Sequence, residues 1–362
     1  MEYLWQYYLL VGTIFLQGIL FCSKKRKKFF YLFTFLILFV LAGFRSWDIG
    51  NDTLTYVHAF MKSIDYPFLT FASHMEKGYL IFNYVLSLIS SNPQAILIVN
   101  AIIIVGAAIS FVRKYSLTPF LSILLFTILM FGNSLNIMRQ FLAISIIVVY
   151  GLKYVEERRF FPFFLVCLLA ATFHRSAIIC LAMYYFYNLK LNYKYILWGA
   201  CLSVVAFFLL RPIIDVCIYI IGHYRGYRGT ILFGNETKVA SVIKTMVNLS
   251  ISLFCLFTYK YVYHKKNSRI QERLPAAFMV FCSLFASLLS FLSIRGTLLG
   301  RLVIYFSYFN IVSIPFFLRC YSANARRVLT YVILLCFLLY DNVVFIYRPN
   351  WNRVLPYEFC FK

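Results

Sequence analysis

The residues most able to do chemistry in this sequence are charged side chains at the ends of long apolar runs. Arg45, Asp48 and Asp52 fall within Phe44–Phe60, FRSWDIGNDTLTYVHAF, directly after the apolar run Phe29–Phe44. Charges of both signs at a membrane boundary are costly unless they are paired or held for a ligand. An arginine here could bind an anionic head group, and a carboxylate could act as general base or orient a sugar hydroxyl.

The same three residues also have a purely structural interpretation. Asp52 precedes an amphipathic helical pattern over Thr53–Ser63, so it could be a helix N-cap. Asp48 is expected to be a structural salt-bridge partner of Arg45. Arg45 and Asp52 therefore stay candidates for the site, and Asp48 does not.

A second set of candidates flanks two later apolar runs. Glu76 stands just before a span, where it could complement a helix dipole or serve the site. Asn133, Asn136 and Gln140 are spaced i, i+3 and i+7, which predicts one shared helix face, with Arg139 beside it. Arg139 has no acidic neighbour in sequence, so it needs a distant partner or an anionic ligand; hydrogen bonding between helices is the alternative.

Two short apolar runs surround a polar turn. Phe160–Phe173 and Ser176–Tyr187 are predicted to form a helical hairpin, with His174 and Arg175 in its turn. A lone histidine is usually structural, but one in a polar turn beside an arginine could shuttle a proton or contact pyrophosphate.

Further arginines follow in the second half of the chain. Arg225 and Arg228 alternate with tyrosine and glycine, a pattern that suits a loop holding phosphate and stacking sugar rings, or an interfacial belt. Arg295 and Arg301 flank a short turn, Gly296–Gly300. We include these four arginines among the candidate substrate-binding residues.

The elements that must position these residues are membrane helices. Of the 362 residues 62% are hydrophobic and only 13% are charged, against about a quarter in soluble proteins. Repeated apolar runs approach the length of about 20 residues that crosses a bilayer. The net charge of +23 lies in short loops, which fits the positive-inside rule rather than nucleic-acid binding. The ten cysteines form no CxxC pair and are interpreted as apolar fillers.

Charge placement predicts the topology. Gly78–Val112 is too long for one helix and contains Asn92-Pro93, so it is two crossings or one crossing with a partial helix. A single crossing puts more than half of the 35 basic residues on the cytoplasmic side, as the positive-inside rule expects. We therefore expect one multi-pass domain, with both termini outside and outer segments at 45–77, 211–238 and 341–362.

Several landmarks together resemble the EpsG family of bacterial polysaccharide polymerases, which are related in role to Wzy O-antigen polymerases. The matching pieces cover nearly the whole chain: Arg45, Gly50-Asn51-Asp52-Thr53, Tyr56, Glu76-Lys77-Gly78-Tyr79, Met138-Arg139-Gln140, Ala143, Phe173-His174-Arg175-Ser176-Ala177, Arg301, Tyr305 and Pro356-Tyr357. Asn51 departs from the threonine that is common at its position in relatives, so the detailed role of this loop stays open.

The resemblance implies an enzyme that joins oligosaccharide repeat units carried on undecaprenyl pyrophosphate. The product would be O-antigen, capsule or exopolysaccharide, made on the outer face of a bacterial inner membrane. We expect no metal and no cofactor, since arginines can neutralise the leaving pyrophosphate. Arg139, Arg301 and Arg175 are our candidates for that role, and Asp52 or His174 for the acceptor hydroxyl. Expected partners are lipid-linked oligosaccharide, membrane lipid, a chain-length regulator and a flippase, and no nucleic acid.

The expected fold is an all-α polytopic membrane protein with about 12 transmembrane helices, short or re-entrant helices near the outer face, and a GT-C-like membrane architecture. Three other functions stay open at this point. An O-antigen ligase would use the same donor. A flippase or transporter would place ionisable residues near the membrane midplane and often shows repeats, neither of which we find in the sequence. A scaffold without chemistry would leave the arginines at span ends unexplained.

Overall fold

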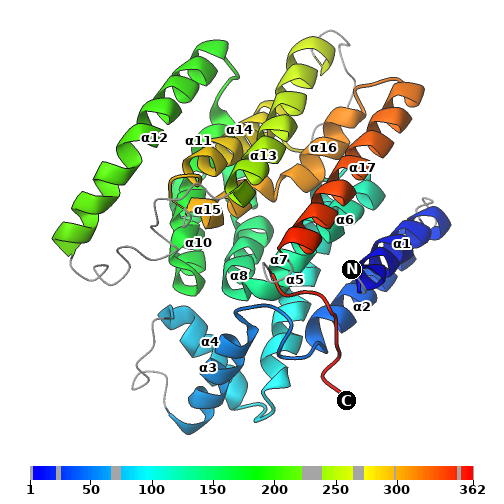
Figure 1. The fold of residues 1–362 in the computed structure, drawn as a ribbon, viewed down its shortest axis with the longest axis vertical. Coiled ribbons are helices and arrows are strands. Elements are labelled where there is room, and N and C mark those ends of the chain that lie inside the picture. The colour runs from blue at the N-terminus through cyan, green and yellow to red at the C-terminus, as the bar shows by residue number, and fades with distance from the viewer. Residues whose placement is uncertain are drawn as a thin grey trace. The chain divides into compact units, whose positions relative to one another are not determined.

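The computed structural model describes residues 3–21, 26–66, 75–221, 239–263, 273–296, 299–348 and 352–361. Within these ranges the regular structure is helical, apart from one isolated β-bridge between Arg45 and Phe359 (Figure 1). The chain forms two compact units. Unit 1 comprises Met1–Leu181 and Ser322–Lys362, and unit 2 comprises Ala182–Tyr321.

Unit 1 contains the helices that carry most of the candidate residues. They are α1 (Leu4–Phe21), α2 (Lys27–Gly43), α3 (Thr53–Asp65), α4 (Lys77–Ser87), α5 (Gln94–Tyr115), α6 (Pro119–Phe126), the π-helix η1 (Thr127–Phe131), α7 (Gly132–Asn136), α8 (Met138–Ile146), the π-helix η2 (Ile147–Gly151), α9 (Leu152–Glu156), α10 (Phe160–Phe173), the 3₁₀-helix η3 (Arg175–Leu181) and α17 (Ala323–Tyr347).

Unit 2 contains the remaining helices. They are α11 (Ala182–Asn188), α12 (Tyr193–Ile221), α13 (Val239–Thr258), the π-helix η5 (Tyr259–Tyr263), α14 (Ala276–Leu292), α15 (Leu299–Ser307) and α16 (Asn310–Leu318).

Length and hydropathy identify the membrane-spanning segments. Seven segments of the described chain are long and apolar enough to cross a bilayer: Leu4–Phe21, Gln94–Tyr115, Pro119–Asn136, Met138–Glu156, Tyr193–Leu210, Val239–Tyr263 and Ala323–Tyr347. The bent pair α15 and α16 makes up to eight, and α10 and α14 are shorter apolar helices. The all-α, polytopic membrane class is therefore confirmed. The count of about 12 crossings and the GT-C-like architecture stay predictions.

The long apolar stretch Gly78–Val112 consists of two helices with a break at Asn92-Pro93. α4 covers only 11 residues, which spans about 16 Å and is too short to cross a bilayer. α5 covers 22 residues and is one of the spanning segments. By length, this stretch fits one crossing preceded by a partial helix; α4 ends at Ser87, and Pro93 is the N-cap of α5.

The predicted shared helix face of Asn133, Asn136 and Gln140 is wrong. α7 ends at Asn136, and α8 begins at Met138. The residue between them, Ile137, has φ −99° and ψ 56°, which is not helical. The two asparagines therefore lie on one helix and Gln140 on the next, so the spacing that predicts a common face does not apply.

The core of unit 1 is built around α5, α8 and α10. Buried side chains on these helices include Phe111, Phe141, Phe163, Cys167 and Ala170. Small residues allow close packing, since a Cβ on Gly151 would come 3.2 Å from the Phe163 ring. These three helices form the scaffold whose ends carry the polar residues.

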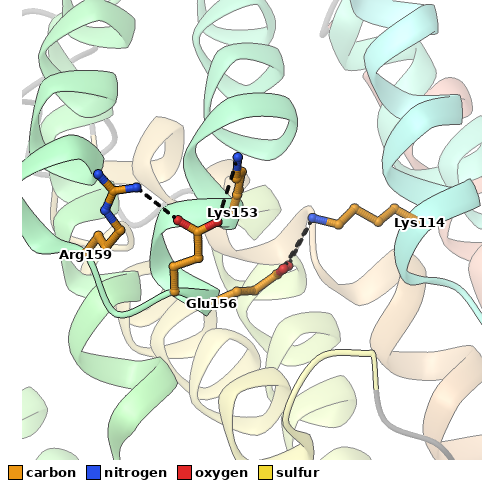
Figure 2. A network of polar contacts seen from close by, with 5 residues as sticks. Lys114, Lys153, Glu156 and Arg159 are labelled. Atoms are coloured by element: carbon orange, nitrogen blue, oxygen red, sulfur yellow. Dashed lines mark hydrogen bonds and ion pairs between the residues drawn. The ribbon is translucent and has the colours of Figure 1, made fainter.

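The two ends of this scaffold differ in chemistry. At the C-terminal end of α5, the Lys114 ammonium pairs with Glu156 of α9 at 3.2 Å, and Glu157 pairs with Lys153 and Arg159 (Figure 2). At the N-terminal end of α5, Gln94 donates to the carbonyls of Gly43 and Arg45. The basic residues near Lys114 and Lys153 thus meet at one end of α5, and the first predicted outer segment meets the other.

Two of the predicted outer segments begin within helices. α12 continues through Pro212 to Ile221, so the first part of segment 211–238 is helical, and 222–238 lie outside the described residues. α17 extends from Ala323 to Tyr347 and includes the start of segment 341–362. Within segment 45–77, the predicted amphipathic helix forms as α3.

Candidate functional site

An ion pair between Glu76 and Arg139 lies at the centre of the candidate site. The Arg139 guanidinium binds the Oε2 atom of Glu76, and the two side chains are only 18% and 11% exposed. Glu76 ends the loop before α4, and Arg139 is the second residue of α8. The distant acidic partner that Arg139 requires is therefore a residue 63 positions earlier in the chain.

Two tyrosine rings flank the same guanidinium. Arg139 Cζ lies 5.7 Å from the Tyr56 ring centroid and 5.9 Å from that of Tyr79, and the two rings meet edge to face. Such cation–π contacts hold an arginine in place while they help to replace its hydration. Burial raises the pKa of the Tyr79 hydroxyl well above its usual range, so that hydroxyl stays protonated.

Close packing of α4 against α10 fixes the position of Glu76. A Cβ on Gly78 would come 2.7 Å from the Thr172 carbonyl oxygen and 2.2 Å from its hydroxyl. Only a residue without a side chain fits there. The approach brings Glu76, two residues earlier, to the end of α10, where its Oε1 accepts the backbone N–H of Arg175 at 3.1 Å.

The chain turns after α10 as predicted, but the second arm is divided into the 3₁₀-helix η3 and α11. α10 ends at Phe173, and η3 begins at Arg175. The His174 Nδ1 atom lies 2.6 Å from the Ser176 hydroxyl, which orients the imidazole. The Arg175 side chain is exposed, and its backbone amide is bound to Glu76. Glu76 thus joins the His174 turn to Arg139.

Asp52 approaches the same cluster from α3. Its position is the N-cap of α3, but its side chain makes no capping hydrogen bond. Its backbone N–H instead donates to Asn136 Oδ1 at 3.0 Å. Tyr56 lies one helical turn further along α3, and residues at this spacing are surface neighbours about 6 Å apart. The half-buried Asp52 carboxylate has no hydrogen-bond or ion-pair partner among the described residues and is therefore available to a ligand.

A short segment near the end of the chain supports these residues. Asn352 accepts from Asn136 at 3.3 Å and donates to Asn133 at 3.2 Å. The Arg353 carbonyl accepts the Gly50 N–H at 2.9 Å, the Glu358 carbonyl accepts the Ser46 N–H, and the Cys360 N–H donates to the Phe44 carbonyl at the end of α2. We call residues 352–361 the strap. Asn352 was missed by sequence reasoning, because an asparagine in a polar tail carries no signal of its distant partners.

Arg45 lies in the protein interior rather than in a ligand site. Its side chain is 1% exposed. The guanidinium donates to the carbonyls of Ala42 and of Leu135, the latter at 2.9 Å, and contacts Met138 Sδ at 3.1 Å. Burial lowers its pKa to about 10, which leaves it charged at neutral pH. These contacts join the end of α2 to the break at Ile137, so the geometry favours a structural role.

The predicted salt bridge between Arg45 and Asp48 is wrong. Asp48 is exposed and forms no ion pair with Arg45, whose terminal nitrogens are bound by carbonyl and sulfur atoms. The carbonyls of Ala42 and Leu135 and the Met138 sulfur bind the two terminal nitrogens, whereas the buried Nε has no hydrogen-bond partner.

The remaining candidates are distributed differently. Gln140 is buried on α8 next to Arg139. Arg295 and Arg301 belong to unit 2, where the Arg295 guanidinium lies 4.8 Å from the Phe207 ring centroid and the Arg301 side chain is exposed. Arg225 and Arg228 lie outside the described residues. Unit 1 thus brings together Asp52, Glu76, Asn136, Arg139, His174 and Arg175.

Comparison with known protein families gives one match that spans these residues. The model of the EpsG family matches residues 7–359, which is nearly the whole chain. The chain belongs to the EpsG family. Membership indicates a polysaccharide polymerase-type function for this multi-pass membrane protein. Neither the curated proteins nor the solved structures contain a match to this EpsG-family chain.

Proposed function

We propose that this EpsG-family protein polymerises oligosaccharide repeat units carried on undecaprenyl pyrophosphate. The products are O-antigen, capsule or exopolysaccharide chains, and the site faces the periplasm or outside of the inner membrane. The proposal is supported by one cluster of unit 1. In it, Glu76 links Arg139 to the turn at His174, and Asn136 binds the backbone of Asp52. The family match spans all of these residues.

The proposed reaction is a displacement at an anomeric carbon. The acceptor hydroxyl oxygen attacks C1 of the donor sugar, and the bond between C1 and the pyrophosphate oxygen breaks. The hydroxyl proton goes to a base, and undecaprenyl pyrophosphate leaves with the bonding electron pair. Arg139 and Arg175 neutralise the charge that develops on the leaving group, as preorganised donors do in other transfer reactions.

The candidates for the general base are Asp52 and His174. Both oxygens of Glu76 are bound, one by Arg139 and one by the Arg175 amide, so we assign this carboxylate a positioning role. The Asp52 carboxylate has no such partners among the described side chains. We propose that Asp52 or His174 accepts the proton of the acceptor hydroxyl.

The test is polymer formation from purified lipid-linked repeat units by the purified chain in a bilayer. Wild-type protein should form a ladder of polymer lengths on a gel, and Asp52→Asn, His174→Ala and Arg139→Ala should each reduce it. Lys153→Ala, at the opposite end of the scaffold, is the matched control and should not. Long polymer from all three site variants at normal protein levels would overturn the site. Transfer of preformed polymer to a lipid core, without chain growth, would identify a ligase instead.

A further inference from the structure

A groove runs along the exposed face of α5 in unit 1. It has a volume of about 430 Å³ and is lined by Gly106, Ile109, Ser110, Arg113 and Lys114. The first four of these residues are spaced i, i+3, i+4 and i+7, so they share one face of the helix. The groove therefore has an apolar end at Gly106 and a basic end at Arg113 and Lys114.

Helix α2 runs antiparallel to α5 and forms one side of the groove. A Cβ added to Gly43 would lie 3.3 Å from Ile98 Cα, and a Cβ added to Gly106 would lie 3.9 Å from the Phe35 ring. These two contacts are eight residues apart on both helices. The register between α2 and α5 is therefore constant, and it continues toward the beginning of α2.

This register brings basic residues of the two helices to one level. Lys28 precedes Phe35 by seven residues on α2, and Arg113 follows Gly106 by seven residues on α5. Seven residues are about two turns, so each basic residue shares a face with the contact residue of its own helix. Lys28, Arg113 and Lys114 thus gather at the same end of the groove.

The carboxylates near this end are engaged elsewhere. Glu156 pairs with Lys114 at 3.2 Å, and Glu157 pairs with Lys153 and Arg159 (Figure 2). None of the described side chains that line the groove is acidic. The groove itself therefore carries net positive charge, which is complementary to an anion.

The length of the groove matches one leaflet of a bilayer. Its apolar part continues to Phe39, whose ring stacks on that of Phe35 at 5.7 Å, and to Ile102 of α5, which is 46% exposed. The 11 residues from Phe39 to Lys28 correspond to about 16 Å along the axis of α2. Half of a hydrocarbon core of about 30 Å is about 15 Å. An acyl chain therefore fits along the apolar part, with its head group at the basic end.

The residues of the basic end suit the phosphate of such a head group. The Arg113 guanidinium can bind two phosphate oxygens, and the exposed Ser110 hydroxyl can donate to a third. This end of α5 is also the one predicted to be cytoplasmic, and the cytoplasmic leaflet is where anionic lipids attract basic residues. The Gln94 end of α5 lies about 33 Å away and contacts Arg45, so the substrate site around Arg139 is not part of this groove.

We infer that the groove between α2 and α5 binds a phospholipid with an anionic head group. Its acyl chain lies over Gly106 and against Phe35, and its phosphate is held by Lys28 and Arg113. The inference is independent of the proposed function, because it uses neither the substrate nor the residues of the Glu76 cluster.

Native mass spectrometry of the full chain in detergent micelles tests this site. The Kd of the first bound lipid is measured by titration with phosphatidylglycerol and, separately, with phosphatidylcholine. Wild type should bind phosphatidylglycerol at least tenfold more tightly. Lys28→Gln and Arg113→Gln should each weaken phosphatidylglycerol binding about fivefold, and together about 25-fold, as expected for the attraction of one basic residue to an anionic lipid.

A second variant tests the groove without changing its charge. Gly106→Leu should weaken phosphatidylglycerol binding about tenfold or more, because its side chain occupies the space of the acyl chain, and the nearest group to an added Cβ is the Phe35 ring at ordinary contact distance. Gly199→Leu is the matched control, since it adds the same side chain in open space on α12. Lys153→Gln is the control for the loss of a charge at the same end of the scaffold.

Three results would overturn the inference. The first is equal binding of phosphatidylglycerol and phosphatidylcholine by wild type. The second is an unchanged Kd for phosphatidylglycerol in Gly106→Leu or in the double variant Lys28→Gln/Arg113→Gln. The third is an equal loss in Gly199→Leu or Lys153→Gln, which would make the effect a general property of the apolar surface or of the net charge.

Discussion

The ion pair between Glu76 and Arg139 makes the sharpest prediction, because both partners are mostly buried. Either Glu76→Ala or Arg139→Ala leaves the other charge without its partner. Breaking a buried pair in this way costs about 3 kcal/mol or more of folding stability. Removing both charges also loses the contacts of Arg139 with Tyr56 and Tyr79, but it leaves no lone charge. We expect the double variant to cost about 3 kcal/mol rather than the sum of about 6.

Activity and stability should respond differently in this set of single and double variants. If Arg139 neutralises a leaving diphosphate, no rearrangement at Glu76 replaces its positive charge. The double variant should therefore be more stable than the sum of the two single losses predicts. It should still form polymer about a hundredfold more slowly than wild type, which corresponds to about 2.7 kcal/mol in the activation barrier. Stability is measured by denaturant unfolding in micelles, and activity by polymer formation from purified lipid-linked units.

The control lies at the other end of the scaffold. Lys153 and Glu157 form an exposed pair at 3.8 Å, and pairs of this kind contribute little. Lys153→Ala, Glu157→Ala and their double variant should match wild type in both assays. Wild-type polymer from the Glu76/Arg139 double variant would refute the reasoning, since the pair would then be a structural salt bridge only.

Three further substitutions test the supports of the site. Gly78→Ala should reduce polymer formation and cost about 1–3 kcal/mol of stability, because its Cβ would clash with the Thr172 backbone and displace Glu76. Gly50→Ala should lower stability by about 1–3 kcal/mol in the same unfolding assay, because Gly50 has φ +90° and an added Cβ would lie 2.9 Å from the Leu135 carbonyl oxygen. Gly12→Ala is the control, because a Cβ on Gly12 would meet open space. Asn352→Leu should cost about 1–2 kcal/mol by removing its bonds to Asn133 and Asn136, and its loss of polymer should be smaller than that of Arg139→Ala.

Local features were predictable where backbone chemistry decides the outcome. The break before α5 follows from Asn92-Pro93, because proline cannot continue a helix, and α10 spans the residues expected from its apolar run. The turn at His174 follows from the same pattern. Apolar length and charge placement were enough to predict a polytopic helical protein.

Long-range pairings were not predictable from the sequence. The need of Arg139 for a distant partner was visible, but the choice of Glu76 depends on how closely α4 packs on α10. The helix break at Ile137 contains neither proline nor glycine, so the sequence does not predict it. This break separates Asn136 from Gln140. The sequence likewise indicated that Arg45 binds a ligand. Its observed partners include backbone carbonyls, which any residue type provides, so they cannot be predicted from the sequence.

The strap has a consequence for how the protein is made. Gln6 and Tyr357, 351 positions apart, exchange hydrogen bonds, and the Gly50 amide depends on Arg353. During synthesis at about 5–20 residues per second, the first outer segment therefore waits many seconds for these partners. A ribosome that stalls after α17 would leave an inserted but uncompleted polymerase. A bulky fusion placed directly after residue 361 should have a similar effect, so reporter tags for this protein are better attached elsewhere.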